Sequence, residues 1–323
     1  MINKMASPTT EPTVSGSITG ESWMGFIGVS TGGSLIREIF PAWAEKLMLP
    51  TSTLIGHDLP IEAPVESYRD LVASIRDDPR HRGALVTTHK TAIYAAAADL
   101  FDELDDSARA FEEISSISKR GGRLVGRAMD PITARLALEE FIGDSYFGGR
   151  RDAAVLGCGG AGVALSHQLG MRRDRPRRII CTDVSEHALN RARSVHARAN
   201  LRHDRYEYLI TDRPEGAADM LAELAPGSLV VNATGLGKDR SGSPVTPAAT
   251  FPEGGVVWEF NYRGQLDFLH HARRQRTCRS LQIEDGWRYF IHGWTQVIAD
   301  VFAIDMPGAT VTTLSRIASR FRR

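Results

Sequence analysis

The chain has 323 residues, three cysteines and a formal net charge of zero, from 39 basic and 39 acidic side chains. This length is too great for one ordinary core and suits two domains of typical size. The balanced charge creates no overall field toward nucleic acid or an anionic membrane, and no apolar run is long enough to span a bilayer. We therefore expect neither nucleic acid nor a membrane as a partner.

The first twenty residues are rich in Ser, Thr, Gly and Pro and carry no basic, apolar signal segment. We expect residues 1–20 to form a disordered leader. The cysteines show no paired metal spacing, and no His, Cys and carboxylate cluster has ligand spacing, so we predict no metal site. A reduced, cytoplasmic setting is the expected location.

Strand and helix patterns alternate after the leader. Short apolar runs predict strands at residues 25–29, 54–56, 84–88 and 124–126. Apolar residues at helical spacing predict helices at residues 35–49, 65–75 and 91–104. Pro41 should end or kink the first of these helices. The alternation predicts an α/β domain over residues 21–131, and its place ahead of a glycine-rich segment suggests that this domain binds the substrate.

The second half shows the same alternation more regularly. After a predicted helix at 132–141, strands are expected at residues 153–156, 178–182, 206–210, 228–232 and 256–260. Helical segments between them indicate a doubly wound parallel sheet, so we expect a Rossmann domain over 132–285. The sheet does not need the last helices, and we expect residues 286–323 to pack back on the first domain.

A glycine-rich segment opens this second half. Residues 157–162 read Gly-Cys-Gly-Gly-Ala-Gly, directly after an apolar strand and before a helical stretch. A turn in that context fits a dinucleotide pyrophosphate at a helix N-terminus. The expected cofactor contacts are Gly157, Gly159, Gly160, Ala161 and Gly162.

An acidic residue, Asp183, ends the next strand about twenty residues further on. Its carboxylate is placed to accept hydrogen bonds from ribose hydroxyls and would repel a 2′-phosphate, which favours NAD over NADP. Arg191, Arg193 and the region of His187 leave NADP open. The alternative is that Asp183 only caps the helix that follows.

A second loop also belongs to the expected cofactor site. Residues 230–237 read Val-Val-Asn-Ala-Thr-Gly-Leu-Gly, a strand running into small residues at the edge of a parallel sheet where ligands bind. We expect Asn232, Thr234 and Gly235 to line the nicotinamide arm. An ordinary tight turn is the alternative.

Two motifs precede the glycine-rich segment, Val-Thr-Thr-His-Lys at 86–90 and Gly-Arg-Ala-Met-Asp at 126–130. The ordered set resembles the shikimate and quinate dehydrogenase family, which has Asn-Val-Thr-x-Pro-x-Lys and Gly-x-Asn-Thr-Asp at these places. Asn-Ala-Thr-x-x-Gly at 232–237, Glu-Phe-Asn-Tyr at 259–262 and a Gly-to-Gln helix extend the resemblance. It covers roughly residues 25–302.

By this resemblance Lys90 and Asp130 form the catalytic pair. Oxidising a secondary alcohol requires a proton acceptor, and a lysine serves if desolvation lowers its pKa, although a nearby carboxylate acts in the opposite direction. The alternative is a surface ion pair of little energetic value. The substrate contacts implied by the resemblance are Ser30, Ser34, Thr87, Ser116 and Gln296.

Several positions depart from the family pattern. The family's Ser-x-Ser-Pro-x-x-His-Asn segment is replaced by Ser-Thr-Gly-Gly-Ser-Leu-Ile-Arg at 30–37, whose hydroxyls and helix-start N–H groups still suit an anion. The pocket asparagine becomes Ser116. Gln296 stands further from its glycine than usual, so Tyr289 or His292 are alternatives. Because unpaired polar groups discriminate strongly between substrates, these changes leave the substrate open.

The sequence thus predicts a two-domain α/β oxidoreductase, a monomer or homodimer, that transfers hydride between NAD and a secondary alcohol on a small anionic ring. Shikimate and quinate are the first expected substrates. One alternative is a non-catalytic nucleotide sensor of the same fold, and another is a dehydrogenase of an aminated ring or different polyol. NAD binding without turnover would favour the sensor.

Overall fold

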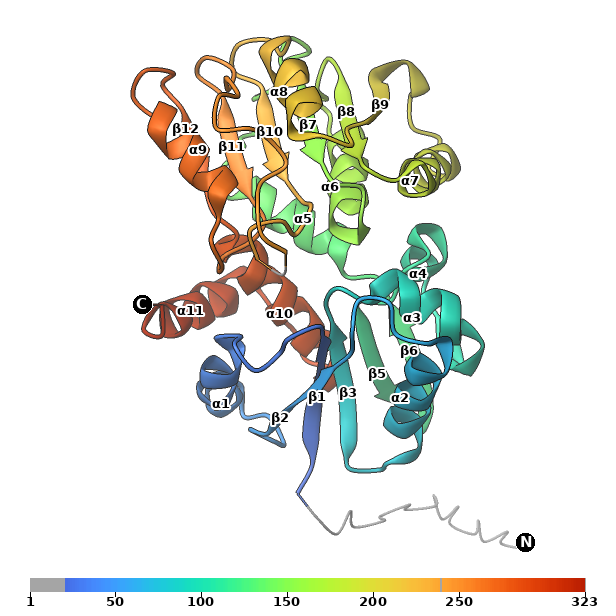
Figure 1. Ribbon diagram of the computed structural model, residues 1–323. Coiled ribbons are helices and arrows are strands. Elements are labelled where there is room, and N and C mark those ends of the chain that lie inside the picture. The colour runs from blue at the N-terminus through green and yellow to red at the C-terminus, as the bar shows by residue number, and fades with distance from the viewer. Residues whose placement is uncertain (1–20, 239, 323) are drawn as a thin grey trace, which may run out of the picture.

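The computed structural model describes residues 21–238 and 240–322, so the leader expected over residues 1–20 lies outside the described part of the chain. The described residues form two bodies, each built around one sheet and stacked end to end (Figure 1). Within those residues, no helix is both long and apolar enough to cross a membrane.

The first sheet has six strands in the order β2-β1-β3-β5-β6-β4. Their bounds are β1 Trp23–Gly28, β2 Leu54–Asp58, β3 His81–Val86, β4 Glu103–Leu104, β5 Ser116–Arg120 and β6 Arg123–Arg127. Strand β1 pairs in parallel with β2 and β3, whereas β5 runs antiparallel to β3 and β6. The sequence did not predict β5, because Ser-Ile-Ser-Lys-Arg holds one apolar residue, although Gly121 and Gly122 with positive φ form a typical hairpin turn.

Four α-helices accompany this sheet: α1 Ile36–Leu47, α2 Val65–Asp77, α3 Lys90–Ala97 and α4 Asp106–Phe111. Helix α1 continues through Pro41, since its fully buried face, including Phe40 and Trp43, holds the helix against the core. The helix expected over residues 91–104 ends at Ala97. A 3₁₀ turn at Ala98–Leu100 follows, and β4 then pairs with β6 instead of continuing the helix.

The second sheet is parallel throughout, with the order β12-β11-β10-β7-β8-β9. Its strands are β7 Ala153–Leu156, β8 Ile179–Asp183, β9 Tyr206–Ile210, β10 Leu229–Asn232, β11 Val256–Glu259 and β12 Gln282–Glu284. The five predicted strands are confirmed to within one residue, and only the short β12 was not predicted. The order reverses between β7 and β10, the place where doubly wound sheets bind ligands.

The helices of this half are α5 Asp130–Glu139, α6 Gly160–Met171, α7 Glu186–Arg198, α8 Pro214–Ala222 and α9 Asp267–Gln275, with a 3₁₀ turn at His203–Arg205. Helix α5 directly follows the first sheet along the chain, yet it packs against α6. The chain therefore crosses from one body to the other at α5, and the pocket described below lies at this crossing.

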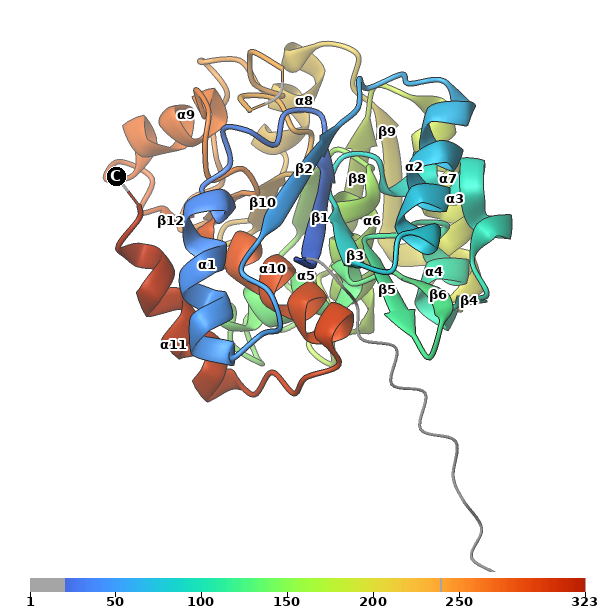
Figure 2. The ribbon, with the colours of Figure 1, turned by 90° about the horizontal axis from the view of Figure 1, so that it is seen from below.

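The last two helices, α10 Trp287–Phe302 and α11 Gly308–Ser319, return to the first body as expected. Figure 2 shows them beside α1 and the first sheet. Apolar residues of α10, among them Trp294 and Ile298, share a core with Met24 and Trp43. The Trp43 indole donates to the Leu314 carbonyl at 2.9 Å, which fixes α11 on α1.

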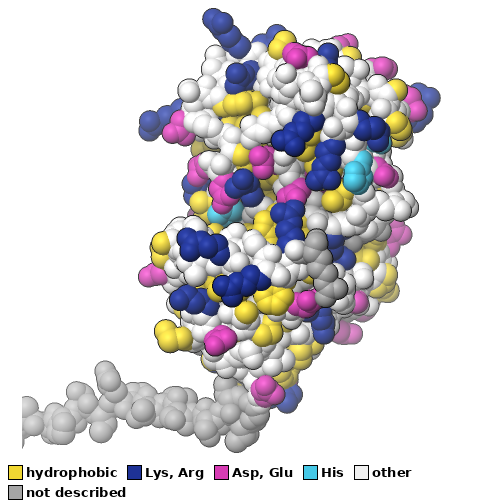
Figure 3. All heavy atoms as spheres, turned by 90° about the vertical axis from the view of Figure 1, so that its left-hand side faces the viewer, with side chains coloured by type: hydrophobic (Ala, Val, Ile, Leu, Met, Phe, Trp, Pro, Cys, Tyr) yellow, Lys and Arg dark blue, Asp and Glu magenta, His cyan; other side chains and the backbone are white. Residues whose placement is uncertain are grey.

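On the face shown in Figure 3, basic and acidic side chains are interspersed over both bodies. This mixing matches the zero net charge of the whole chain.

Candidate active site

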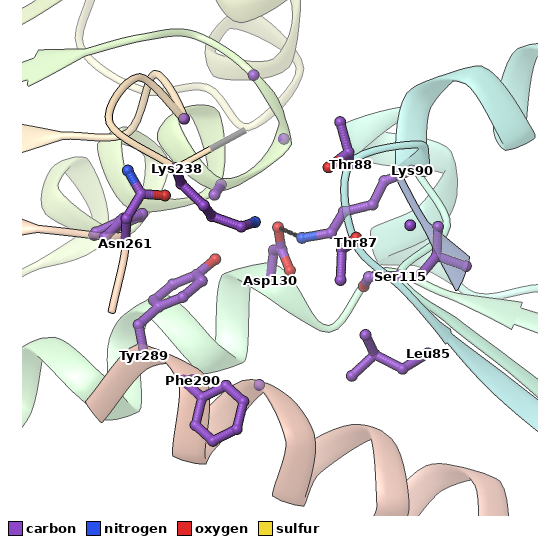
Figure 4. Close-up of a pocket in the computed structure, with 18 of the residues that line it drawn as sticks. Leu85, Thr87, Thr88, Lys90, Ser115, Asp130, Lys238, Asn261, Tyr289 and Phe290 are labelled. Atoms are coloured by element: carbon purple, nitrogen blue, oxygen red, sulfur yellow. Dashed lines mark hydrogen bonds and ion pairs between the residues drawn. The ribbon is translucent and has the colours of Figure 1, made fainter. Parts of the chain in front are cut away.

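A pocket of about 390 Å³ lies where the carboxyl ends of the two sheets face each other. The first body supplies the residues that follow β1 and β3, the second supplies the loops after β7 and β10, and α10 forms one wall. Figure 4 shows side chains from these elements pointing into one space. The pocket therefore draws on segments that are far apart in the sequence.

Lys90 and Asp130 meet in this pocket, each as the first residue of a helix. The ammonium of Lys90 donates to Oδ2 of Asp130. Their side chains are 15% and 8% exposed, so the pair is not the surface ion pair considered as the alternative. Burial makes the charge of each group sensitive to its neighbours.

A second carboxyl, Glu113, lies next to this pair and was missed by the sequence reasoning. It is fully buried, and neither of its oxygens has a hydrogen-bond partner among the described residues. Burial, and secondly the negative charge of Asp130, raise the pKa of Glu113 to about 8, while Lys90 acts in the opposite direction. The available signal was a glutamate directly followed by an apolar residue, Ile114.

Two further polar side chains approach Asp130 from the opposite side. Tyr289 on α10 and Lys238 on the loop after β10 both point toward its carboxylate (Figure 4). Complete burial raises the pKa of the Tyr289 phenol, and the carboxyls of Asp130 and Glu113 raise it further. Sequence reasoning named Tyr289 only as an alternative and did not find Lys238.

The expected anion-binding loop lies on the pocket rim. Ser30 and Ser34 both line the pocket, and the Ser34 hydroxyl lies 3.0 Å from the Tyr262 hydroxyl. Arg263 donates to the Ser30 carbonyl at 3.2 Å, which links this loop of the first body to the second. Thr87, also expected here, lines the pocket as well.

The structure places Ser116 outside the pocket. Its hydroxyl donates to Oδ2 of Asp300 at 2.6 Å, in a buried cluster that also holds Arg120 and Arg127. The preceding residue, Ser115, lines the pocket instead, because successive side chains of a strand point to opposite faces. The serine in the pocket is therefore Ser115, one residue before the predicted Ser116.

Gln296 also lies outside the pocket lining, although it is buried on α10. The face of α10 toward the pocket carries residues spaced by three and four, namely Tyr289, Phe290, Gly293, Trp294 and Val297. His292, the other alternative, bonds through Nε2 to Glu140 at 2.7 Å. Tyr289 is thus the one of these three that reaches the pocket.

The glycine-rich turn has the form expected of a phosphate cradle. A Cβ built on Gly162 would lie 1.9 Å from the Gly157 carbonyl oxygen, whereas one on Gly159 would meet no atom within 4 Å. Gly159, Gly160 and Ala161 line the pocket at the start of α6. Backbone N–H groups at an open helix N-terminus suit a phosphate group, so these residues fit a dinucleotide.

Asp183 lies beside this turn, outside the residues that line the pocket. Its Oδ2 accepts from the Cys158 N–H at 2.7 Å and its Oδ1 from the Ser185 N–H at 2.9 Å. Helix α7 is capped by Ser185, whose hydroxyl accepts from the Ala188 N–H. The alternative that Asp183 is the helix cap is therefore wrong.

Of the residues expected at the cofactor site in the loop after β10, two line the pocket and one does not. Thr234 and Gly235 line the pocket, while Asn232 is buried behind them. The Asn232 side chain accepts from the Thr234 N–H at 3.1 Å and donates to Glu259 at 2.7 Å. Asn232 thus links the loop to Glu259 of β11 through hydrogen bonds. Over the described residues, no group of three or more His, Cys, Asp or Glu is placed to hold a metal ion.

No protein-family model matches this chain. Among curated proteins it is similar to the shikimate dehydrogenase (NADP(+)) of Symbiobacterium thermophilum, with 32% identity over 189 residues, which cover 58% of this chain and 60% of that protein. It is also similar to the shikimate dehydrogenase (NADP(+)) of Streptococcus gordonii, with 27% identity over 54% of this chain and 58% of that protein. The match thus spans about three fifths of the length of each relative.

Solved structures extend the likeness to nearly the whole chain. The quinate dehydrogenase from Corynebacterium glutamicum in complex with NAD has a TM-score of 0.69 at 16% identity, over 93% of this chain and 99% of that one. The shikimate 5-dehydrogenase from Listeria monocytogenes in complex with shikimate and NAD has a TM-score of 0.67 at 20% identity, over 95% and 99%. The resemblance to the shikimate and quinate dehydrogenase family is confirmed, and the fold is the one these enzymes share.

Proposed function

We propose that this chain is an NAD(P)-dependent dehydrogenase that transfers hydride between the cofactor and a secondary alcohol of a cyclic hydroxy acid, as shikimate and quinate dehydrogenases do. The observation that carries the proposal is the buried Lys90–Asp130 pair, which shares one pocket with the open turn of Gly159. In this scheme residues 21–131 bind substrate, 132–285 bind the cofactor, and 286–323 close the first domain.

Residues of this chain take up the hydroxyl proton of the alcohol. When bound, the nicotinamide cofactor supplies the hydride acceptor or donor. The Lys90 amine takes the hydroxyl proton of the alcohol, and Asp130 holds the resulting ammonium in line with the substrate oxygen. Tyr289 points toward the same carboxylate (Figure 4). Closure of the two bodies around a bound substrate would exclude water from this proton transfer.

For the cofactor we propose NAD rather than NADP. The Asp183 carboxylate ends β8 beside the glycine-rich turn, where it would repel a 2′-phosphate. The nearby Arg191 guanidinium bonds to the carbonyls of Phe111 and Cys158, and Arg193 bonds to Glu186. Both arginines are therefore bound to groups of the protein and are not placed to pair with a 2′-phosphate. The two curated relatives described above are NADP(+) enzymes, so this preference separates the chain from them.

For the substrate we propose an anionic ring, with shikimate and quinate tested first. Cationic side chains of Lys238, Arg240 and Arg263 line the pocket, along with the hydroxyls of Ser30 and Ser34. The serine that lines the pocket is Ser115, not the Ser116 predicted to replace the family's asparagine, and a hydroxyl makes fewer hydrogen bonds than an amide. A ring with a different hydroxyl or amine pattern therefore remains part of the proposal.

The setting of the protein is proposed on chemical grounds. Cys158, Cys181 and Cys278 are all free, and two of them are buried beside the glycine-rich turn and in β8. Free buried thiols are typical of a reducing compartment, so we propose a cytoplasmic location. We propose a monomer or a homodimer as the assembly.

The test is reduction of NAD and NADP at alkaline pH with shikimate, quinate and a panel of cyclic hydroxy acids, followed at the reduced-nicotinamide absorbance band. NAD-linked turnover on one of them, lost in Lys90→Ala, is the expected result. Turnover that survives in Lys90→Ala would remove the assignment of the pair. NAD binding without turnover on any compound would favour a nucleotide sensor with the same fold.

A further inference from the structure

Glu113 is a buried carboxyl that the proposed mechanism leaves without a role. It lies between α4 and β5, is fully buried, and has no hydrogen-bond partner for Oε1 or Oε2 among the described residues. Burying a polar group without a partner costs free energy, so such a group in a site requires an explanation. The position of Glu113 in the fold suggests that explanation.

The carboxyl lies against the back of the cofactor turn. A Cβ built on Gly160 would lie 2.2 Å from Oε2 of Glu113 and 3.6 Å from Cδ of Lys90. The carboxyl and the lysine stem thus flank the same point of the first turn of α6. Gly160 and Lys90 line the pocket and Glu113 does not, so any influence of Glu113 on a bound ligand is indirect.

Backbone contacts fix this arrangement. The Ile114 N–H, next to Glu113, donates to the Lys90 carbonyl at 3.1 Å. The Arg191 guanidinium donates to the Phe111 carbonyl at 3.2 Å and to the Cys158 carbonyl at 2.9 Å, which ties the segment before Glu113 to the glycine-rich turn. These contacts tie the segment of Glu113 to Lys90 and to the glycine-rich turn.

Charged and titratable side chains from five helices or their caps surround Glu113. They are Lys90 of α3, Asp105 at the cap of α4, Asp130 of α5, Arg191 of α7 and the phenol of Tyr289 on α10. Burial and Asp130 raise the pKa of Glu113 to about 8, against the effects of Lys90 and Arg191. Burial and the neighbouring carboxylate thus favour the protonated form of Glu113.

We propose that Glu113 is a positioning residue that controls the charge of Lys90 from behind the cofactor turn and extends to higher pH the range in which Lys90 is an ammonium. The inference rests on the proposed function. In the reductive direction the substrate carbon takes hydride from the reduced cofactor, and one proton passes from the Lys90 ammonium to the carbonyl oxygen. The products are an alcohol and a neutral amine. An ionised Glu113 adds a second negative charge beside Lys90 and so favours the ammonium form.

The first test is the pH–rate profile of Glu113→Gln in both directions. Gln keeps the shape of the side chain and removes its charge. We expect the limb that reports Lys90 to move to lower pH by about one unit, in oxidation and in reduction alike. Lower activity at every pH with an unmoved limb would show a packing role only and would overturn the inference.

The matched control is Glu112→Gln, the same substitution one residue earlier. Glu112 is half-exposed and pairs with Arg198 at 3.1 Å, away from the pocket. Its profile should superimpose on that of the original chain. An equal shift in Glu112→Gln would mean that general charge, and not the position of Glu113, moves the profile, and this too would overturn the inference.

A second measurement is independent of turnover. In protein labelled with ¹³C at glutamate carboxyls, the resonance missing from Glu113→Gln should titrate near pH 8 and move higher in Lys90→Met, because a cation has been removed. Titration near pH 4, or an unchanged midpoint in Lys90→Met, contradicts the inference. If no substrate is turned over, the proposed function fails, and this titration still decides whether Glu113 and Lys90 are coupled.

Discussion

The two sheets contribute to one pocket in different ways. Around the glycine-rich turn and at the start of the loop after β10, the chain's backbone forms the wall, because Gly159 and Gly235 leave open space that no side chain fills. Across the pocket, side chains form the wall: Lys90 pairs with Asp130, and Tyr289 of α10 points toward the same carboxylate (Figure 4). A backbone wall depends on glycines at fixed spacing, whereas a side-chain wall depends on which way each residue points.

The side-chain wall should show the largest effect of a single substitution. Lys90→Ala removes the proposed proton acceptor without touching the glycine-rich turn, so kcat should fall by about 10²- to 10⁴-fold. The affinity for NAD, measured by calorimetry, should stay within about twofold of the original. Lys46→Ala, at an exposed lysine in the last turn of α1, serves as the control and should leave both quantities unchanged. A loss of NAD affinity equal to the loss of kcat would mean that the two walls do not act separately.

The backbone wall can be tested at two glycines. Gly162→Ala places a Cβ against the Gly157 carbonyl, so the turn must shift, and we expect both lower stability to denaturant and weaker NAD binding. Gly159→Ala meets no atom within 4 Å and has φ −65°, so the fold should be unaffected while the new methyl occupies the space for the phosphate. We expect NAD affinity to fall by about tenfold, or about 1.4 kcal/mol, in Gly159→Ala.

Unchanged NAD affinity in Gly159→Ala would place the pyrophosphate elsewhere. A loss of stability in Gly159→Ala as large as that in Gly162→Ala would contradict the open space at this turn. Gly216→Ala provides the control, since a Cβ there also meets no atom within 4 Å and Gly216 lies on α8, away from the pocket lining.

The same contrast explains how much the sequence could predict. The parallel strands and the turn of 157–162 were predicted correctly because continuous apolar runs and glycine spacing are local signals. The strand β5 was missed, and with it the alternation that places Ser115 in the pocket and Ser116 behind it. Glu113 was missed because burial of a carboxyl depends on packing between α4, α6 and α10, which no local pattern reports.

Ser115, directly before β5, and Ser116, its first residue, allow the alternation to be tested directly. Ser116→Ala removes a hydrogen bond to the buried Asp300 carboxylate, so the free energy of unfolding should fall by about 1–3 kcal/mol with KM unchanged. Ser115→Ala should raise KM for the substrate, because its hydroxyl lines the pocket and also accepts from the Met129 N–H beside Asp130. Denaturant unfolding and steady-state kinetics on both variants give the comparison. A larger rise of KM in Ser116→Ala would reverse the assignment of the two faces.

The smallest expected effect concerns Asp183, whose carboxylate accepts from the Cys158 N–H in the glycine-rich turn. Asp183→Asn keeps an acceptor for one of the two N–H groups that Asp183 now binds and removes the negative charge. The ratio of kcat/KM for NAD to that for NADP should fall by about fivefold, or about 1 kcal/mol, because the repulsion of a 2′-phosphate is reduced. Glu186→Gln, a neighbouring acid paired with Arg193, is the matched control and should change the ratio less. An equal change in both variants would mean that the general negative charge at the start of α7, and not the carboxylate beside the glycine-rich turn, sets the choice of cofactor.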